Sequence, residues 1–455
     1  MEVRITSESA ERSEALASPM DAARAVFEGG ESEFVLLYSG EAGGNAVLGV
    51  DPLITLTADA QGKVALAGPG GIVLPTEPLA ALESLIAQVA VFAESPLVGW
   101  MGFLSYDIGR HIERIPAIAV DDLQWPVLRF ALFRHYVVFH QGAAKVNTLS
   151  LPGESPRALN LSPVQRAAGS VSAEVVKQLP HAAFEEKIRR VKEYIAAGDI
   201  YQANLAQRWD VRSNLTPFEV FERLCEFSAA PYAAFMRFDD GAAGTGTRHV
   251  ASASPELFLQ AENGELITRP IKGTRPRDLA DPGRDAALRD ELVASAKDRA
   301  ELTMIVDLLR NDVGRVSGFG TVQVIDPRAL EQHPTVWHTV ATIASRLRGD
   351  ARLAEILAAL CPGGSITGAP KIRAMQIIEE LEPTRRGLYC GNIGVIGPGA
   401  TSLLLNIAIR TILFQGGRAY VHAGGGIVAD SEPGREYEET LHKAAAMMRA
   451  LGVAG

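Results

Sequence analysis

The stretch KDRAELTMIVDLLRNDVGRV, residues 297–316, decides the fold class. Apolar residues in this stretch and just before it recur at intervals of three and four, which predicts one long helix from about Asp285 to Arg310. The stripe that faces the core consists of Leu292, Ala296, Leu302, Ile305, Val306 and Leu309. Because long helices are interspersed with irregularly spaced strand-like segments, we expect an α+β fold rather than a repeated βαβ design.

Strand-like segments and a linker precede this helix. The segments are FVLLYSG (34–40), VLGV (47–50) and LFRHYVVFH (132–140), which are short, apolar and separated by Gly and Pro. Residues 151–180 begin with a run rich in Pro, Ser and Ala, which predicts a linker. The chain therefore divides into an N-terminal region (1–150), the linker and a C-terminal region (181–455).

The C-terminal region contains further predicted elements. Apolar residues at helical spacing predict a helix from Phe184 to Ile195, which Gly198 ends. The segment IYQANLAQRWDV (200–211) has the alternating faces of a strand. A helix should begin near Pro370, and the last one should run from near Pro433 to about residue 451.

Composition excludes several classes of protein. The 455 residues are 47% hydrophobic with a net charge of −10, so we do not expect nucleic-acid binding, which needs a basic face. Three widely spaced cysteines without a CxxC pattern suit a reducing compartment. The polar N-terminus is unlike a signal peptide, and no apolar run reaches membrane-spanning length. We therefore expect a cytoplasmic protein without a membrane segment.

Two pairs of acidic residues indicate a metal site. Asp298 and Glu301 share one helix face, and Glu436 and Glu439 share another. If the two faces meet, the carboxylates repel one another unless a cation compensates, and Mg²⁺ suits such oxygen ligands. The alternative is that both pairs are solvated, with Lys443 forming an ordinary surface ion pair with Glu439.

Two glycine-rich segments are candidates for anion binding. They are CPGGSITGAPK (361–371) and HAGGGIVADS (422–431). The first precedes a predicted helix N-terminus, and the second can present backbone N–H groups to a carboxylate. The alternative for each is an ordinary tight turn. Neither matches a Walker A loop or a dinucleotide-binding fingerprint.

Glu256 in SASPELF and Lys272 in RPIKGTRPR are candidates for acid and nucleophile. A carboxyl group in an apolar setting can keep its proton and donate it. An amine must lose its proton before it attacks carbon, which burial or the nearby Arg275 and Arg277 could favour. His338, one of nine histidines, is either catalytic or a core or surface residue.

Together these segments resemble the family of chorismate-utilising enzymes, over about residues 180 to 450. The matching stretches, in the family's order, are IYQANLAQR, SASPELF, TRPIKGTRPR, KDRAELTMIVDLLRNDVGRV, GGSITGAPKIRAMQIIEELEP, YCGNIG and AGGGIVADS. VLLYSG (35–40) and VGWMGFLSYDIGR (98–110) resemble the accessory region that anthranilate and aminodeoxychorismate synthases share. The resemblance implies a large two-layer antiparallel β-sandwich with helices packed outside.

The resemblance also assigns roles to residues. It implies Mg²⁺ held by Glu301 and Glu439, with Asp298 and Glu436 supporting through water. Glu256 is expected to protonate the chorismate 4-hydroxyl, and His338 matches the family's active-site histidine. The expected substrate-binding residues are Thr274, Thr367, Gly368, Tyr389, Arg410, Gly425, Gly426 and Lys443.

Two positions indicate the aminodeoxychorismate branch of the family. Members that add water have a lysine base where this chain has Gln202, so the resemblance implies ammonia as the nucleophile. Anthranilate synthases have alanine in PIAGTR, where this chain has Lys272. The implied product is 4-amino-4-deoxychorismate, a precursor of 4-aminobenzoate and folate.

The resemblance implies partners as well. The sequence has no GxCxGxQ glutaminase motif, so ammonia should come from a glutamine amidotransferase subunit or from free ammonium. Ser39 and Pro231–Tyr232 resemble parts of a tryptophan pocket, and whether tryptophan binds stays open. The alternatives are anthranilate synthase component I and a non-catalytic relative that binds chorismate or tryptophan.

Overall fold

The computed structural model describes residues 3–11, 18–39, 45–91, 95, 97–140, 143–151, 159, 161, 170–239 and 246–453. Much of the predicted linker, 151–180, lies outside the described residues. Its described end contains strand β9 (Ala173–Gln178). In the described part of the chain, no helix is long and apolar enough to cross a membrane.

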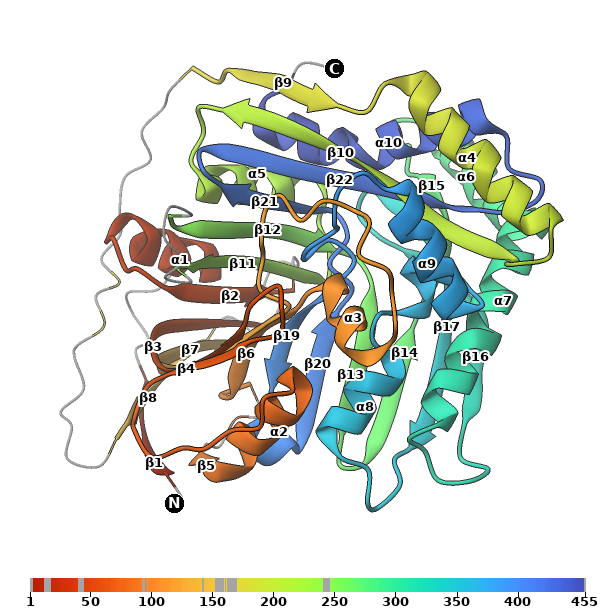
Figure 1. The fold of residues 1–455 in the computed structure, drawn as a ribbon. Coiled ribbons are helices and arrows are strands. Elements are labelled where there is room, and N and C mark those ends of the chain that lie inside the picture. Colours follow the sequence, from red (N-terminus) through yellow and green to blue (C-terminus); the bar gives the residue numbers. More distant parts are fainter. Residues whose placement is uncertain are drawn as a thin grey trace.

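Two antiparallel sheets that share long strands form the frame of the molecule (Figure 1). The first sheet begins at β9 and continues through β10 (Gln202–Ser213), β22 (Arg418–Ile427), β21 (Thr411–Gln415), β12 (Arg248–Ser254), β11 (Tyr232–Phe238), β2 (Phe34–Tyr38), β3 (Ala46–Ala58), β7 (Leu128–His140), β8 (Ala143–Ser150) and β1 (Val3–Glu11). The N-terminal and C-terminal regions therefore share this sheet, since β2 pairs with β11.

The second sheet continues from the other half of β7. Its strands are β6 (Trp100–Leu104), β19 (Asn392–Ile396), β20 (Ser402–Asn406), β13 (Leu257–Glu262), β14 (Glu265–Arg269), β17 (Val336–Arg346) and β16 (Gln323–Gln332). Strand β15 (Ile271–Pro276) also pairs with β17. The short strands β4 (Val64–Ala67), β5 (Val89–Val91) and β18 (Gly368–Ala369) pair with β3, β1 and β10.

Strands β3 and β7 connect the two sheets because they pair with each other along their length. One half of β7 pairs with β6 and the other half with β8. The register of β3 shifts between Pro52 and Ile54, and Asp51 has a φ of +61°. Such an irregularity bends a strand and lets it pass from one sheet to the next.

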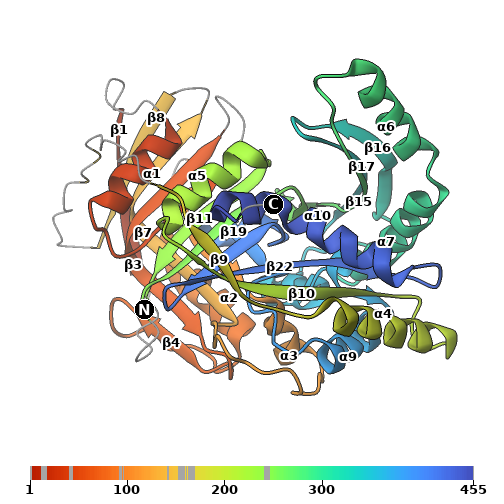
Figure 2. The ribbon, with the colours of Figure 1, turned by 90° about the horizontal axis from the view of Figure 1, so that it is seen from above.

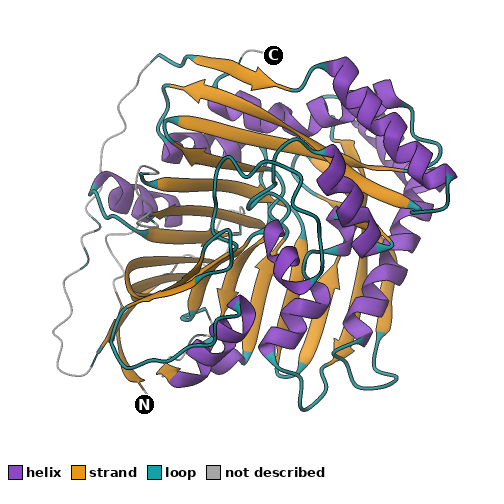
Figure 3. Ribbon diagram, viewed as in Figure 1, coloured by secondary structure: helices purple, strands orange, loops and turns teal. Residues whose placement is uncertain are grey.

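Helices cover the outside of the sheets, as the resemblance implies (Figure 3). They are α1 (Pro19–Glu28), α2 (Pro78–Gln88), α3 (Gly109–Ile112), α4 (His181–Ala196), α5 (Pro217–Phe227), α6 (Pro282–Ala294), α7 (Ala296–Gly314), α8 (Leu353–Leu360), α9 (Lys371–Leu381) and α10 (Pro433–Leu451). Helices α1, α5 and α10 share one apolar core cluster with the first sheet, and α7 packs against β17. The predicted two-layer α+β sandwich is confirmed.

The predicted helices that start near residues 184, 370 and 433 are confirmed, and so is strand β10. The single helix from Asp285 to Arg310 is wrong, because the chain breaks at Ser295 into α6 and α7. The Ser295 hydroxyl accepts a hydrogen bond from the Asp298 N–H, so Ser295 caps α7. Figure 2 shows α6 and α7 beside β15–β17, with α10 passing near α7.

Candidate functional site

Strand β15 carries Lys272 towards the first sheet. Next to Lys272, Gly273 has a φ of +86° within a break in the β15–β17 register. A Cβ at Gly273 would lie 2.8 Å from Leu292 Cδ1, so glycine allows β15 to pass close to α6. The Lys272 Nζ lies 3.3 Å from the place where a Cβ of Gly426 would stand on β22. The Lys272 side chain therefore reaches from β15 of the second sheet to β22 of the first.

Helices α7 and α10 bring carboxylates together beside Lys272. Glu301 comes from α7, and Glu436 and Glu439 come from α10. The Lys297 Nζ lies 3.9 Å from Glu301 Oε1 and 3.6 Å from Glu436 Oε1. The two predicted acidic helix faces therefore meet, with one ammonium between them.

A further lysine, Lys443 of α10, contacts this group. Its Nζ is 2.7 Å from Glu439 Oε1 and donates a hydrogen bond of 2.9 Å to the Gly424 carbonyl oxygen. Burial raises the pKa of Glu439, but the Lys443, Lys297 and Lys272 ammoniums outweigh burial, so the net pKa is lowered. For Glu301, burial outweighs the neighbouring lysines, so the pKa is raised.

Asp298, a further predicted metal-site residue, lies near Glu301 and is paired with an arginine. Its Oδ2 lies 3.3 Å from Arg275 Nη2, and Arg275 Nε also donates to Glu291 Oε1 at 2.8 Å. Arg277 pairs with Asp285 at 2.9 Å. Arg275 therefore has carboxylate partners on α6 and α7, and Arg277 has one on α6.

The glycine run 424–426 lies inside strand β22 and is not a tight turn. A Cβ at Gly424 would lie 2.5 Å from the Leu205 carbonyl oxygen of β10, which requires glycine there. A Cβ at Gly425 would stand 3.3 Å from Glu436 Oε2, so the carboxylates of α10 lie directly over the strand. Strand β21 pairs only with Arg418–Val421, so within the described residues the rest of this edge of β22 has no strand neighbour.

Gln202 lies at the start of β10, beside Lys272. Its side chain is 1% exposed, and within the described part of the chain neither its Nε2 nor its Oε1 has a hydrogen-bond partner. The Nε2 is 2.4 Å from the Cβ position of Gly426. A buried amide without a partner is costly, so it marks a place where a polar ligand can bind.

Glu256 is buried within electrostatic reach of Lys272. It is 4% exposed, and its Oε1 accepts a hydrogen bond of 2.6 Å from the Ser365 hydroxyl. Burial raises the pKa of Glu256 to about 7, against the Ser365 hydrogen bond and the Lys272 and Lys443 charges, which lower it. Glu256 can therefore hold and release a proton near neutral pH.

His338 and Thr274 face each other across β15 and β17. The Thr274 hydroxyl lies 2.9 Å from His338 Nδ1, which fixes the ring, while Nε2 has no partner among the described residues. Burial, with the charge of Arg410, lowers the pKa of His338 to about 3, so the imidazole is neutral. Arg410 donates to the Ser228 hydroxyl at 3.3 Å, and it lies near His338 as a further cation.

Three other predicted substrate-binding residues lie deeper in the structure. Thr367 is fully buried, and its hydroxyl donates to the Gly363 carbonyl oxygen at 3.0 Å. Gly368 pairs with Ala203 of β10 in β18. The Tyr389 ring stacks on His422 with centroids 5.0 Å apart. The Thr367 carbonyl oxygen also accepts a hydrogen bond of 2.8 Å from the Asn204 N–H of β10, so all three residues lie against β10 or β22.

Sequence reasoning missed a buried ion pair between Arg386 and Glu382, which are 2% and 6% exposed. Arg386 donates to Glu382, to the Asn204 carbonyl oxygen of β10 and to the Ile366 carbonyl oxygen. Glu382 also accepts from the Ala206 N–H at 2.8 Å. The pair therefore joins the strand of Gln202 to the loop next to Ser365. In a sequence, residues of opposite charge four positions apart are typical of a surface ion pair. The sequence therefore did not indicate that Glu382 and Arg386 are buried.

The carboxylates of Glu301 and Glu439 offer the oxygen atoms that a hard divalent cation prefers. Within the described residues, no three His, Cys, Asp or Glu side chains are arranged to hold a metal ion by themselves. Mg²⁺ in proteins commonly uses one or two carboxylates and completes its shell with substrate oxygens and water. Glu301 and Glu439 fit that pattern, and the lysines around them mark a site that needs positive charge.

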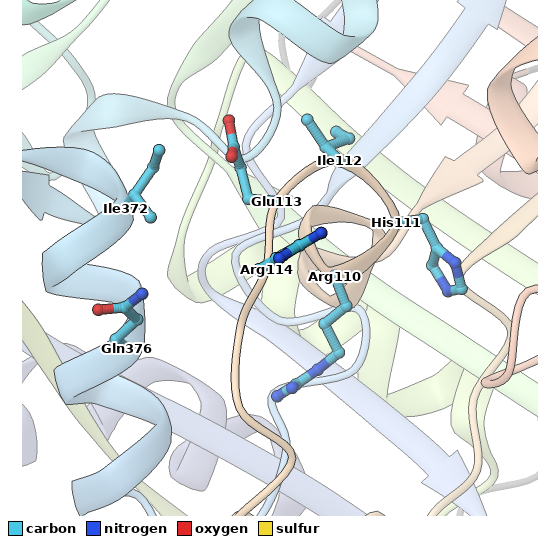
Figure 4. Close-up of a pocket in the computed structure, with 7 residues that line it drawn as sticks. All are labelled: Arg110, His111, Ile112, Glu113, Arg114, Ile372 and Gln376. Atoms are coloured by element: carbon cyan, nitrogen blue, oxygen red, sulfur yellow. The ribbon is translucent and has the colours of Figure 1, made fainter.

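A separate surface pocket lies between α3 and α9 (Figure 4). It is lined by Arg110, His111, Ile112, Glu113, Arg114, Ile372 and Gln376. None of the predicted site residues lines it, and Arg110 is already paired with Asp107 and Glu379. The candidate site is therefore the group of converging side chains around Lys272.

Comparisons with known proteins agree on one family. The model of the chorismate binding enzyme family matches residues 33–449. Aminodeoxychorismate synthase component 1 of Salmonella typhimurium is 37% identical and covers 92% of each chain. The protein of that name from Klebsiella aerogenes is 40% identical over 78% of this chain and 77% of its own. The structure resembles anthranilate synthase component I from Streptococcus pneumoniae, with a TM-score of 0.76, 30% identity and coverage of 89% and 92%.

The buried Glu256 should make stability depend on pH. Its pKa is about 7 in the folded chain against an ordinary value of 4.5, so its ionisation opposes folding. The protonated carboxyl group contributes its full stabilisation below pH 4.5, and this stabilisation is lost as the pH rises to 7. The loss in the free energy of unfolding amounts to about 3 kcal/mol. Glu256→Gln should therefore be more stable than the unmodified chain at pH 8, and the advantage should shrink towards pH 5. Urea unfolding at both values measures this, and an advantage independent of pH would contradict it.

Proposed function

Because the chain belongs to the family of chorismate binding enzymes, we propose that it converts chorismate and ammonia to 4-amino-4-deoxychorismate. This product leads to 4-aminobenzoate and folate. The single observation that carries the proposal is the position of Lys272, beside the unpartnered amide of Gln202 and within electrostatic reach of the buried Glu256. A lysine there can attack the ring, and an amide in place of a base suits an uncharged nucleophile.

The reaction follows from these positions in two steps. The Lys272 amine forms a bond to ring C2, the two conjugated double bonds of the ring shift, and the C4–O bond breaks as Glu256 donates a proton, releasing water. Ammonia then forms a bond to C4, both double bonds shift back, and the C2–N bond breaks to free Lys272. The extra proton of the new amine returns to Glu256, and the enolpyruvyl group stays on the product.

The carboxylates of chorismate are held by cations and backbone groups. Arg410 lies near the neutral His338, and Lys443 is fixed between Glu439 and the Gly424 carbonyl oxygen. The edge of β22 that β21 leaves unpaired offers backbone N–H groups near Gly425 and Gly426. We assign Thr274 to orienting His338.

Magnesium dependence is part of the proposal. Glu301 and Glu439 would hold the ion, with Asp298 and Glu436 supporting them. When bound, Mg²⁺ supplies positive charge that neutralises a substrate carboxylate beside acidic side chains. The residues of the chain do the remaining work, because they orient the ring, exclude water and transfer the proton.

We propose that ammonia comes from a separate glutamine amidotransferase subunit, since the chain has no GxCxGxQ motif. The tryptophan pocket stays a prediction. Ser39 follows β2, and Tyr232 begins β11. The two strands pair with each other, and Tyr38 stands opposite Ala233. The Ser39 hydroxyl is buried without a partner among the described residues, as an empty polar pocket would leave it. Calorimetry with tryptophan would test binding.

The test of the proposed function is product analysis. The purified chain is incubated with chorismate, Mg²⁺ and ammonium, and products are identified by mass spectrometry with and without an aminodeoxychorismate lyase. We expect a product that retains the enolpyruvyl carbons and yields 4-aminobenzoate only when the lyase is present. Direct release of 2-aminobenzoate and pyruvate would instead identify an anthranilate synthase. Absence of turnover would favour a non-catalytic chorismate-binding protein.

The protonated form of Glu256 should set the alkaline limb of activity. Since its pKa is about 7 in the substrate-free chain, kcat/KM should fall about tenfold per pH unit above that value. Ser365→Ala removes a hydrogen bond that lowers this pKa, so its limb should move to higher pH. Profiles between about pH 6 and 9 measure both effects, with Ser365→Thr as the control that keeps the hydroxyl. Coincident limbs in all three proteins would contradict this role for Glu256.

Replacing Lys272 should separate covalent from electrostatic catalysis. Lys272→Ala should lower single-turnover product formation on the order of 10³-fold or more, since it removes the nucleophile. Lys272→Arg keeps the positive charge without a nucleophilic amine and should be similarly impaired. Rapid-quench measurement gives the rates. Full single-turnover chemistry in Lys272→Ala, or substantial recovery in Lys272→Arg, would argue against a covalent role.

A further inference from the structure

Lys297 is a cation that the proposed reaction leaves without a role. It lies in the first turn of α7, next to Asp298 and four residues before Glu301. Its ammonium reaches the carboxylates of two helices, at 3.9 Å from Glu301 Oε1 and 3.6 Å from Glu436 Oε1. The side chain is 53% exposed, so much of it faces solvent while its ammonium contacts the acidic group.

The three lysines around these carboxylates differ in how firmly they are held. Lys443 is fixed by Glu439 and by a hydrogen bond to the Gly424 carbonyl oxygen. Lys272 is partly buried, beside Gln202 and Gly426. Lys297 has two longer carboxylate contacts, at 3.9 and 3.6 Å, and its side chain is 53% exposed against 45% for Lys443. It is therefore the ammonium that can leave the group at least cost.

A divalent cation and the Lys297 ammonium compete for the same charges. Both are attracted by Glu301, and they repel each other at short range with an energy that grows with the charge of the ion. We propose that Lys297 is the resident counterion of the carboxylate group in the metal-free protein. It withdraws to solvent when a divalent cation binds, and thereby sets the affinity of the site. This inference rests on the metal site of the proposed function.

Cation affinity of the full chain tests the proposal without any assay of activity. Binding of Mn²⁺ is measured by electron paramagnetic resonance, and Mg²⁺ is measured by competition. Lys297→Met should bind both ions about tenfold more tightly than the unmodified chain. Lys297→Arg, which keeps the charge, should remain close to the unmodified chain. Arg299→Met removes an exposed charge two residues away on α7 and should change affinity by no more than about twofold.

The solvent accessibility of the Lys297 amine provides a second test of the proposal. Its rate of acetylation by a lysine-selective reagent, followed by peptide mass spectrometry, should rise when Mg²⁺ is added. The proposal is overturned if Lys297→Met binds the ions no more tightly than Arg299→Met, if it binds them more weakly, or if no protein binds them. Product analysis reports separately on the proposed function, because a chain that forms 2-aminobenzoate can still show the affinity change at Lys297.

Discussion

The buried pairing of Arg386 with Glu382 is the constraint on which the site depends. The Arg386 guanidinium holds the carbonyl oxygens of Asn204 and Ile366, and Glu382 holds the Ala206 N–H. Strand β10 and the glycine-rich loop are thereby fixed to one charged pair in the interior. Loss of one partner would leave an uncompensated buried charge, which costs about 3–5 kcal/mol. The rigid frame then presents Gln202 on one side and Ser365 on the other.

Charge balance explains why the remaining side chains gather around Lys272. It lies within electrostatic reach of Glu256, Glu301 and Glu439, and it lowers the pKa of each. The outcomes differ because the surroundings differ: Glu256 is buried with one hydroxyl partner, whereas Glu439 is paired with Lys443. One carboxyl group can therefore carry a proton near neutral pH while another remains an anion suited to a cation.

The sequence alone predicted the elements with strong periodicity or clear ends, such as α10 and β10. It failed at Ser295, because the apolar stripe continues across the break and only the cap distinguishes two helices from one. The sequence left a tight turn open as the alternative for glycines 424–426, yet they are strand residues whose lack of side chains makes room for β10 and for Glu436. The roles of Glu301 and Glu439 came from resemblance to a family. Arg386 and Lys297 could not be found from sequence, because their partners come together only through folding.

Lys272, Glu256 and the carboxylates of α7 and α10 should surround one substrate. A crystal structure of the Glu256→Gln variant with chorismate and Mg²⁺ would show whether they do. We expect the ring between Lys272 and residue 256, with the C4 hydroxyl facing residue 256 and the ion on Glu301 and Glu439. A ring bound elsewhere, or one whose C4 hydroxyl faces away from residue 256, would mean that these residues do not form one active site.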